Sequence, residues 1–161
     1  MTLAADIAKV LVPDGKIQVW ELPIAVSTTP YTAADAVGGI IVLPAASRTK
    51  VGGGAIVSMT VVDLADQAAA LQLGLFNVPF IPTADNAPIA ISDADALNCV
   101  GVLLIATTDY SDFGGFQVAS AKNQWLGYQC LDGNLYGQLK TTGTPTYGLA
   151  ELKLRVIAIW D

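Results

Sequence analysis

The chain has 161 residues, no histidine and a net charge of −6, with eight Lys and Arg against fourteen Asp and Glu. Because histidine is the commonest proton carrier near neutral pH, its absence excludes Ser-His and Cys-His catalytic dyads. Phosphate binding needs concentrated positive charge, so nucleic acid is not an expected partner of this acidic chain. The composition predicts a protein that packs and binds. It is not expected to be an enzyme, and no catalytic residue, metal site or cofactor is predicted.

Apolar residues make up 53% of the chain and the mean hydropathy is +0.52, both high for a soluble monomer. Identical copies are expected to cover part of this apolar surface, so we predict a homo-oligomer. No membrane span is predicted, because the longest uncharged stretch, Gln67 to Ala84, is interrupted by glycine, asparagine and proline. The first lysine is Lys9, and the N-terminus lacks the positive region of a signal peptide.

Residues 1–15 are predicted to form a short N-terminal helix or arm. Four apolar side chains have helical spacing there, at Leu3, Ile7, Val10 and Leu11, and a Pro-Asp-Gly turn follows them. From residue 16 the pattern changes to the alternation of a half-buried strand. Residues 16–161 are therefore predicted to form a single β-sandwich domain.

Nine runs have the apolar content or alternation of strands and are separated by Gly, Pro, Asn and Asp. They are Ile17–Leu22, Gly39–Leu43, Ala55–Leu64, Leu71–Phe76, Cys99–Ala106, Phe116–Ala121, Gln124–Cys130, Leu135–Lys140 and Leu149–Trp160. Parallel βαβ units would need helices of ten or more residues between strands, and these are missing. The pattern predicts an all-β fold, an antiparallel sandwich or barrel, and a jelly-roll-like sandwich is the preferred version.

Two C-terminal segments carry local predictions. Asp132-Gly133 supplies the positive φ angles of a tight turn, so the strands on either side, within Gln129–Tyr136, are expected to pair as a hairpin. The run from Glu151 to Trp160 begins with polar alternation and ends apolar. One face of its first half is expected to reach solvent, and its second half to be buried in the core or in a subunit contact.

Several polar pairs have the residue types of catalytic or metal sites, and each also has a structural interpretation. They are Ser120 with Lys122, Asp93 with Asp95, Asp109 with Asp112, and Glu21 with Glu151. The first pair is interpreted as a solvated surface pair. Asp93 and Asp95 follow Ser92 and are interpreted as a capped helical turn, in preference to a calcium site. The segment from Asp109 to Asp112 is interpreted as a loop whose side chains bond to nearby backbone.

Gly52-Gly53-Gly54, preceded by Arg48 and Lys50, superficially resembles a phosphate cradle. The spacing of a P-loop is missing and a strand follows, so a flexible or bulged strand entry is predicted. Arg48, Lys50 and the N-terminal arm are offered as contacts to an acidic partner or at an interface rim.

The aromatic residues and the two cysteines are assigned to packing. Trp20, Trp125 and Trp160, with Tyr31, Tyr110, Tyr128, Tyr136 and Tyr147, do not cluster on one short element, so core packing or subunit contacts are preferred to a sugar-binding groove. Cys99 and Cys130 fit no zinc site, and buried free thiols are preferred to a disulfide.

Three segments together resemble a group of small tailed-phage virion proteins. They are Tyr31–Gly38, Gly52–Asp63, and Asp93-Ala94-Asp95 before the strand Val100-Gly101-Val102, and Thr141–Tyr147 looks like the penultimate loop of that group. The resemblance implies a capsid decoration (cement) protein with a β-sandwich fold, often a trimer, which binds the major capsid protein on the outside of the head. It also implies synthesis in the bacterial host cytoplasm. A small-molecule ligand is not expected, and neither nucleic acid nor membrane is an expected partner, for the reasons of charge and hydropathy given above.

Two other functions remain open from the sequence. The same architecture suits a tail or receptor-binding module of lectin-like type, with tyrosines expected to be exposed for binding. A carboxylate-based glycan hydrolase is the third hypothesis, with Asp93 and Asp95, Asp109 and Asp112, or Glu21 and Glu151 as the open carboxylate pairs.

Overall fold

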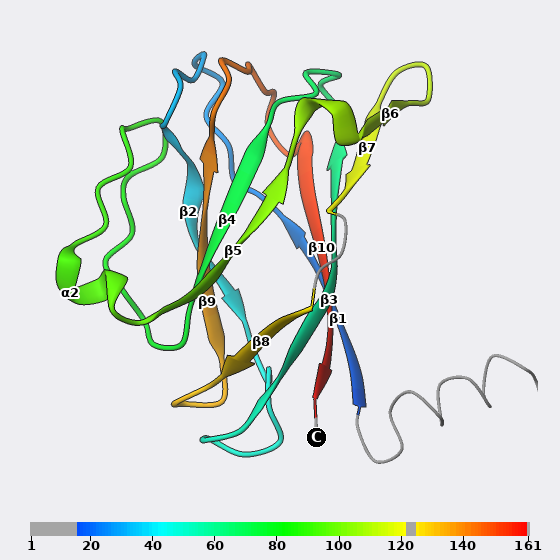
Figure 1. Cartoon of the computed structure of the whole chain (residues 1–161). Helices are drawn as coiled ribbons and strands as arrows, with labels where there is room; N and C mark the ends of the chain where they lie inside the picture. The colour runs from blue at the N-terminus through cyan, green and yellow to red at the C-terminus, as the bar shows by residue number, and fades with distance from the viewer. Residues whose placement is uncertain (1–15, 122–124, 161) are drawn as a thin grey trace, which may run out of the picture.

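The computed structural model describes residues 16–121 and 125–160 (Figure 1). The fold is all-β, with two antiparallel sheets of six and four strands that face each other as in a β-sandwich. The helix or arm predicted for residues 1–15 lies outside the described residues.

The strands are numbered in chain order, with one short helix and one 3₁₀ turn between them. Their bounds are β1 Lys16–Pro23, β2 Ala36–Leu43, β3 Gly53–Asp63, β4 Leu71–Phe76, α2 Asp93–Ala96, β5 Cys99–Ile105, η1 Thr107–Asp109, β6 Tyr110–Asp112, β7 Gln117–Ser120, β8 Leu126–Gln129, β9 Leu135–Thr141 and β10 Leu152–Trp160. The six-stranded sheet has the order β1-β10-β3-β7-β6, with β8 also paired to β3. The four-stranded sheet has the order β2-β9-β4-β5.

Each of the nine predicted runs overlaps a strand, so this part of the prediction is confirmed. The last strand begins at Leu152, after the predicted start, because Ala150 has a positive φ of 62° that ends the extended backbone before it. Strand β6 was not predicted, since three residues are too short to show a period.

The core lies between the two sheets, where alternate side chains of each strand point inward. From β10 these are Leu152, Leu154, Val156 and Ala158, and from β4 they are Leu71, Leu73 and Leu75, all at most 2% exposed. Burial of such a side chain contributes about 1.5–3 kcal/mol relative to its exposure. Lys153 and Arg155 alternate with them and are exposed, as predicted for the first half of this segment.

Strand β3 begins with glycines because other backbone lies very close to it. A Cβ at Gly53 would lie 2.6 Å from the carbonyl oxygen of Tyr128, and one at Gly54 would collide with the carbonyl oxygen of Ile159. Further along, Val57 is the extra residue at a shift in the pairing of β3 with β10. A strand therefore starts at Gly53 as predicted, but the bulge lies within β3 at Val57 and not at the glycines, which serve close packing.

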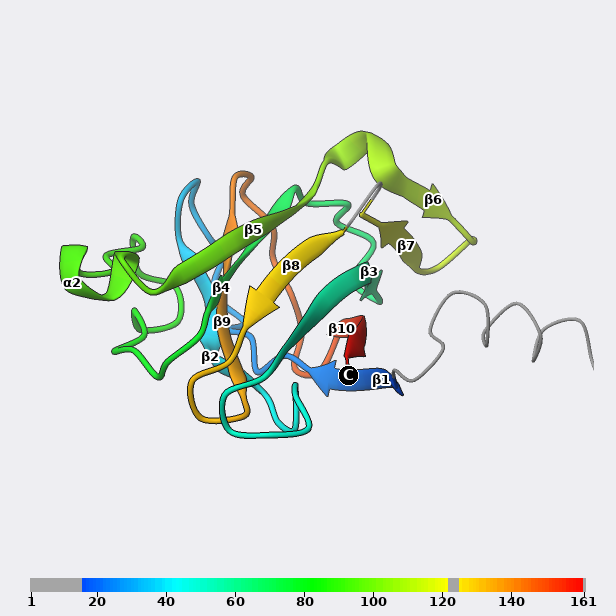
Figure 2. The same cartoon turned by 60° about the horizontal axis from the view of Figure 1, so that its bottom comes forward.

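The prediction that Asp132-Gly133 closes a hairpin of paired strands is wrong. The turn itself forms: Gly133 has a φ of 90°, and Asp132 Oδ1 accepts the N–H of Asn134 at 3.0 Å. The strand before it, β8, pairs with β3 in the six-stranded sheet, whereas β9 pairs with β2 and β4 in the four-stranded sheet. The turn therefore carries the chain between sheets, and in Figure 2 β8 lies between β5 and β3.

Asp63 organises the turn that follows β3. Its carboxylate is fully buried, and Oδ1 accepts the N–H of Ala65 at 3.0 Å. Oδ2 accepts the N–H groups of Gln67 and Ala68, each at 2.9 Å. These bonds hold a turn in which Asp66 and Ala68 have positive φ. Burial raises the pKa of Asp63 above its ordinary value, although the three N–H bonds oppose this shift.

Two buried tyrosines join distant segments at one end of the sandwich. The rings of Tyr31 and Tyr147 meet edge to face, with centroids 6.0 Å apart. Burial raises the pKa of Tyr31, so its hydroxyl stays protonated and donates to Asp85 Oδ1 at 2.7 Å while accepting the N–H of Ser27 at 2.8 Å. The hydroxyl of Tyr147 is buried without a hydrogen-bond partner.

The two tyrosines give a matched test of this framework. Tyr31→Phe removes a hydroxyl with two partners and is expected to lower the free energy of unfolding by about 1–2 kcal/mol. Tyr147→Phe removes an orphan hydroxyl and is expected to leave stability unchanged or slightly higher. Urea unfolding of both variants measures the difference, and equal losses would contradict these assigned roles.

Asp63 gives a test with a defined pH dependence. Because its pKa is raised on folding, its contribution to stability is fully present below about pH 4 and is lost as the pH rises through the raised pKa. Asp63→Ala leaves three N–H groups without an acceptor and is expected to cost about 1–3 kcal/mol. Urea unfolding at several pH values measures the difference in free energy of unfolding between wild type and Asp63→Ala. This difference should become smaller as the pH rises. Asp93→Asn, at an exposed position distant in sequence from this turn, is the control and should stay within about 0.5 kcal/mol.

Candidate binding surfaces

Of the pair Ser120 and Lys122, only Ser120 can be placed, because Lys122 lies outside the described residues. Ser120 lies in β7 directly opposite Thr60 of β3, and their hydroxyl oxygens are 3.1 Å apart. Ser120 is exposed, so this contact is a cross-strand hydrogen bond on the outer face of the sheet.

The aspartate pairs have local structural roles. Ser92 caps α2: its hydroxyl donates to Asp95 Oδ2 at 2.8 Å and accepts the N–H of Asp95 at 3.1 Å. Asp109 Oδ2 accepts the N–H of Ala106, and Asp112 Oδ1 accepts the N–H of Gly114. The capped turn is therefore confirmed. Asp109 ends the turn η1, however, and the residues after it form β6 instead of the predicted loop.

The two glutamates make separate contacts. Glu21 Oε1 lies 3.5 Å from Arg155 Nε in an exposed ion pair between β1 and β10. Glu151 accepts the N–H of Gly148 and closes the turn before β10. Within residues 16–121 and 125–160 there is no group of three or more His, Cys, Asp or Glu that could hold a metal ion.

The tyrosines are not exposed, which corrects the expectation behind a lectin-like surface. Tyr31, Tyr128, Tyr136 and Tyr147 are buried and Tyr110 is half-buried. Hydroxyls that have partners point to backbone or carboxylate oxygen, such as Tyr128 to the carbonyl of Ala46 at 2.6 Å. Among the tryptophans, Trp20 and Trp160 are buried and Trp125 is 71% exposed.

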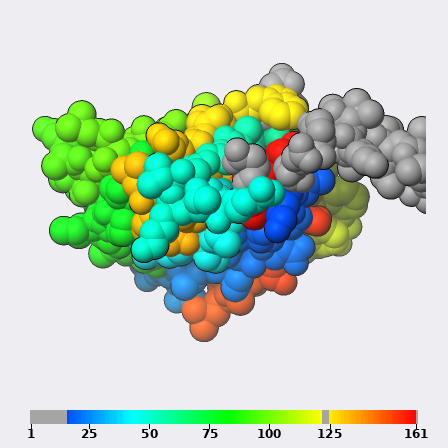
Figure 3. Space-filling model, turned by 90° about the horizontal axis from the view of Figure 1, so that it is seen from below, coloured from blue at the N-terminus to red at the C-terminus, as the bar shows by residue number. Residues whose placement is uncertain are grey.

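The turn between β2 and β3 carries Arg48 and Lys50, both exposed. This turn lies beside β1, because Trp20 Nε1 donates to the carbonyl of Pro44 at 2.9 Å. Figure 3 shows the turn (cyan) and the start of β1 (blue) side by side on the lower surface. The proposed contact of these two cations with a partner stays a prediction.

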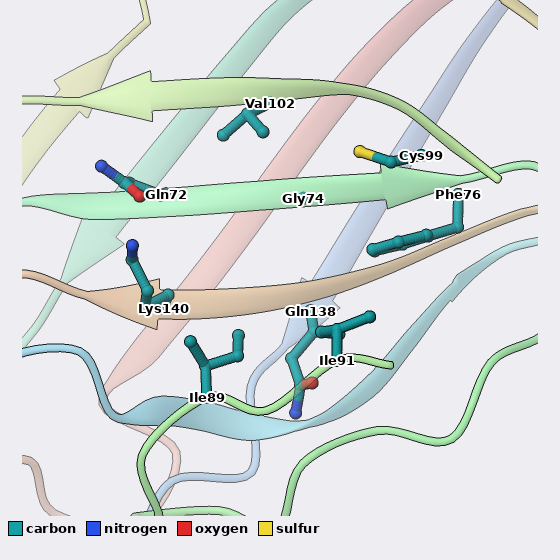
Figure 4. A pocket seen from close by; sticks show the side chains of 9 residues that line it. All are labelled: Gln72, Gly74, Phe76, Ile89, Ile91, Cys99, Val102, Gln138 and Lys140. Carbon is teal, nitrogen blue, oxygen red and sulfur yellow. The ribbon is translucent and has the colours of Figure 1, made fainter. Parts of the chain in front are cut away.

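A hollow of about 240 Å³ lies on the outer face of the four-stranded sheet, and we call it the outer-face hollow. Figure 4 shows Gly74 at its centre on β4, between Gln72 and Phe76. Cys99 and Val102 line it from β5, and Gln138 and Lys140 from β9. Its lining is mainly apolar, with Lys140 as the charged group at its margin.

The long connection between β4 and β5 supplies the remaining wall of this hollow, through Ile89 and Ile91 (Figure 4). The connection is held against the sheet by Gln138, whose Oε1 accepts the N–H of Thr83 at 3.0 Å and whose Nε2 donates to the Thr83 carbonyl at 2.6 Å. Gln138 is 1% exposed, so these bonds are shielded from water.

No sequence pattern predicts this hollow, because its walls come from four separate segments. The only local signal was Gly74 at an outward position of a strand, where glycine often marks a close approach. Gly74 has no such contact: a Cβ there would meet its nearest neighbour, a ring atom of Phe76, at an ordinary 3.5 Å. The glycine therefore leaves open space on the outer face.

A second hollow of about 490 Å³ lies on the outer face of the six-stranded sheet. Its lining includes Glu21, Lys153 and Arg155 at one end of β1 and β10. At the other end of β1, Ile17 and Val19 are 56% and 39% exposed. Both outer faces of the sandwich therefore combine apolar side chains with a few charges, as binding surfaces do.

No protein-family model matches the chain, and no curated protein matches it. Within the part of the chain that the structure describes, no helix is long and apolar enough to cross a membrane.

The two cysteines are free, and their environments predict different reactivity. Cys130 is fully buried, and burial raises the pKa of its thiol. Cys99 is exposed at the outer-face hollow, which corrects the expectation that both thiols are buried. In dilute native protein a maleimide should modify Cys99 readily and Cys130 only after unfolding, because reaction needs access and a thiolate. Peptide mapping by mass spectrometry identifies the modified residue. Modification of Cys130 at a similar rate would contradict the described packing.

Proposed function

We propose that this chain is a structural virion protein that decorates the outside of an assembled phage head and stabilises it against the pressure of packaged DNA. The observation that carries the proposal is the apolar surface on the outer faces of both sheets, at Ile17 and Val19 and at Val102 and Leu104. Exposed apolar patches of this kind mark surfaces that bind other proteins.

The segments that resemble phage virion proteins also support the proposal, because they belong to one connected framework. Tyr31–Gly38 and Thr141–Tyr147 are joined by backbone hydrogen bonds, including Tyr31 N–H to Pro145 and Thr141 N–H to Asp35. The segment Gly52–Asp63 supplies β3, the central strand of the six-stranded sheet. The resemblance therefore rests on residues that define the fold.

Stabilisation of a shell follows from selective binding. A protein that binds the assembled lattice, and not the free subunits, shifts the equilibrium toward assembly by its binding free energy. A trimer at local threefold axes would add weak contacts by multivalency. A jelly-roll-like strand order and the major capsid protein as partner belong to the same proposal, as do a location on the outer surface of the virion and the absence of enzymatic activity.

The tail or receptor-binding alternative has less support, because it relied on exposed tyrosines. The tyrosine rings are buried or half-buried, and the exposed Trp125 has no exposed tyrosine to form a stacking platform with.

Thermal rupture of particles tests the decoration role. Heads that lack the chain should release DNA at a lower temperature than the same heads after addition of the purified protein, because bound protein must dissociate before the lattice opens. A dye that reports released DNA measures the rupture temperature. Unassembled shell subunits serve as the control and should form no complex. Equal rupture temperatures with and without bound protein would contradict the proposal.

A further inference from the structure

The β6–β7 hairpin presents two aromatic rings to solvent. Phe113 and Phe116 are 63% and 37% exposed and stack with centroids 5.4 Å apart and planes at 10°. The N–H of Phe113 donates to the carbonyl of Phe116 at 3.0 Å, across a turn in which Gly114 and Gly115 have positive φ. The pair is therefore held in place at the tip of a hairpin, and we call it the aromatic tip.

The base of this hairpin is fixed to the sandwich. Tyr110 donates from its hydroxyl to the carbonyl of Ala69 at 2.8 Å, and Gln117 Nε2 donates to Asp66 Oδ1 at 2.6 Å. Apolar rings on such a pre-ordered projection lose little conformational entropy when they bind. Binding that covers them removes their exposed apolar surface from water, which favours association.

The aromatic tip and the outer-face hollow lie on different sides of the molecule. In Figures 1 and 2 the hairpin of β6 and β7 projects on the right, whereas α2 and the connection that walls the hollow lie on the left. Since the hairpin is fixed at its base, one copy cannot insert its tip into its own hollow.

The hollow, about 240 Å³, and the tip are complementary in polarity and charge. Its apolar walls include Ile89, Ile91 and Val102, and Lys140 lies at its margin. Beside the tip stands the exposed carboxylate of Asp112, opposite in charge to Lys140.

We infer that copies of this chain assemble head to tail, with the aromatic tip of one copy inserted into the outer-face hollow of the next. Each copy then contributes one tip and one hollow, so the contact is heterologous. Repetition of a heterologous contact closes into a ring when its rotation permits and otherwise continues as a filament. This inference concerns self-assembly and does not depend on the capsid role.

Sedimentation of designed variants tests the contact. The wild type should sediment as an oligomer, and Phe113→Ser with Phe116→Ser should weaken self-association by about 100-fold or more, since each 1.4 kcal/mol is tenfold in affinity. Leu149→Ser, at another exposed apolar residue that is 78% exposed, is the control and should retain the oligomer.

Filling the hollow should have the same effect as removing the tip. Gly74→Ile places a side chain in the open space without backbone strain, because the added Cβ meets only ordinary contacts. Gly39→Ile adds the same side chain to strand β2 of the same sheet, away from the hollow, and serves as the matched control. Thermal unfolding of each variant verifies that it is folded.

A mixture of the tip variant, Phe113→Ser with Phe116→Ser, and the Gly74→Ile variant tests the contact most directly. The tip variant keeps its hollow and the Gly74→Ile variant keeps its tip, so the mixture should form heterodimers and nothing larger. Maleimide modification of Cys99, which lines the hollow, should slow with concentration in the wild type and not in the tip variant. A monomeric wild type, an undiminished oligomer in the tip variant, or a mixture that stays monomeric would each overturn the inference.

Discussion

The contact between the inward faces of the two sheets determines the rest of the structure. Alternate residues of β10, among them Leu154 and Val156, share one buried core with alternate residues of β4, such as Leu73 and Leu75. Because side chains alternate along a strand, burial of this set commits the residues between them to the outer faces. The strand alternation that builds the core therefore also determines which apolar side chains lie on the outer faces, where other proteins can bind them.

Polar side chains, the buried Asp63 and Gln138 and the half-buried Asp85, then fix where the connections lie. Asp63 holds the turn after β3, Asp85 binds Tyr31 and the N–H of Gly38, and Gln138 binds the connection between β4 and β5. A buried polar group left without a partner costs about 1–3 kcal/mol. Each loop is therefore held in the arrangement that keeps its hydrogen bond. The outer-face hollow follows from the Gln138 bonds, because they hold the connection that forms one of its walls.

The sequence predicts the strands well because alternation is a local property. Leu71–Phe76 appears in the structure with the predicted bounds, and the cap at Ser92 forms as its residue type indicates. Strand partners are not local. Asp132-Gly133 makes the turn that its residues favour, yet the strands beside it join different sheets, because their partners are chosen by packing with distant segments.

The candidate surfaces were still less accessible to sequence analysis. The outer-face hollow combines Gly74, Ile89 and Val102 from three separate segments. A pattern within one segment cannot predict that these residues lie together. The tyrosines illustrate the converse: isolated aromatics favoured core packing, and hydrogen bonds such as Tyr110 to the carbonyl of Ala69 let their hydroxyls point inward.

The proposed function uses no chemical reaction, only a rigid sandwich that presents its outer faces to a repeating lattice. Quantitative mass spectrometry of purified virions from the source of the gene tests this account most directly, by comparing copies of this chain with copies of the major shell protein. A ratio near one to one, or another fraction set by the lattice, is the predicted result. A few copies per particle, or none, would contradict a decoration role.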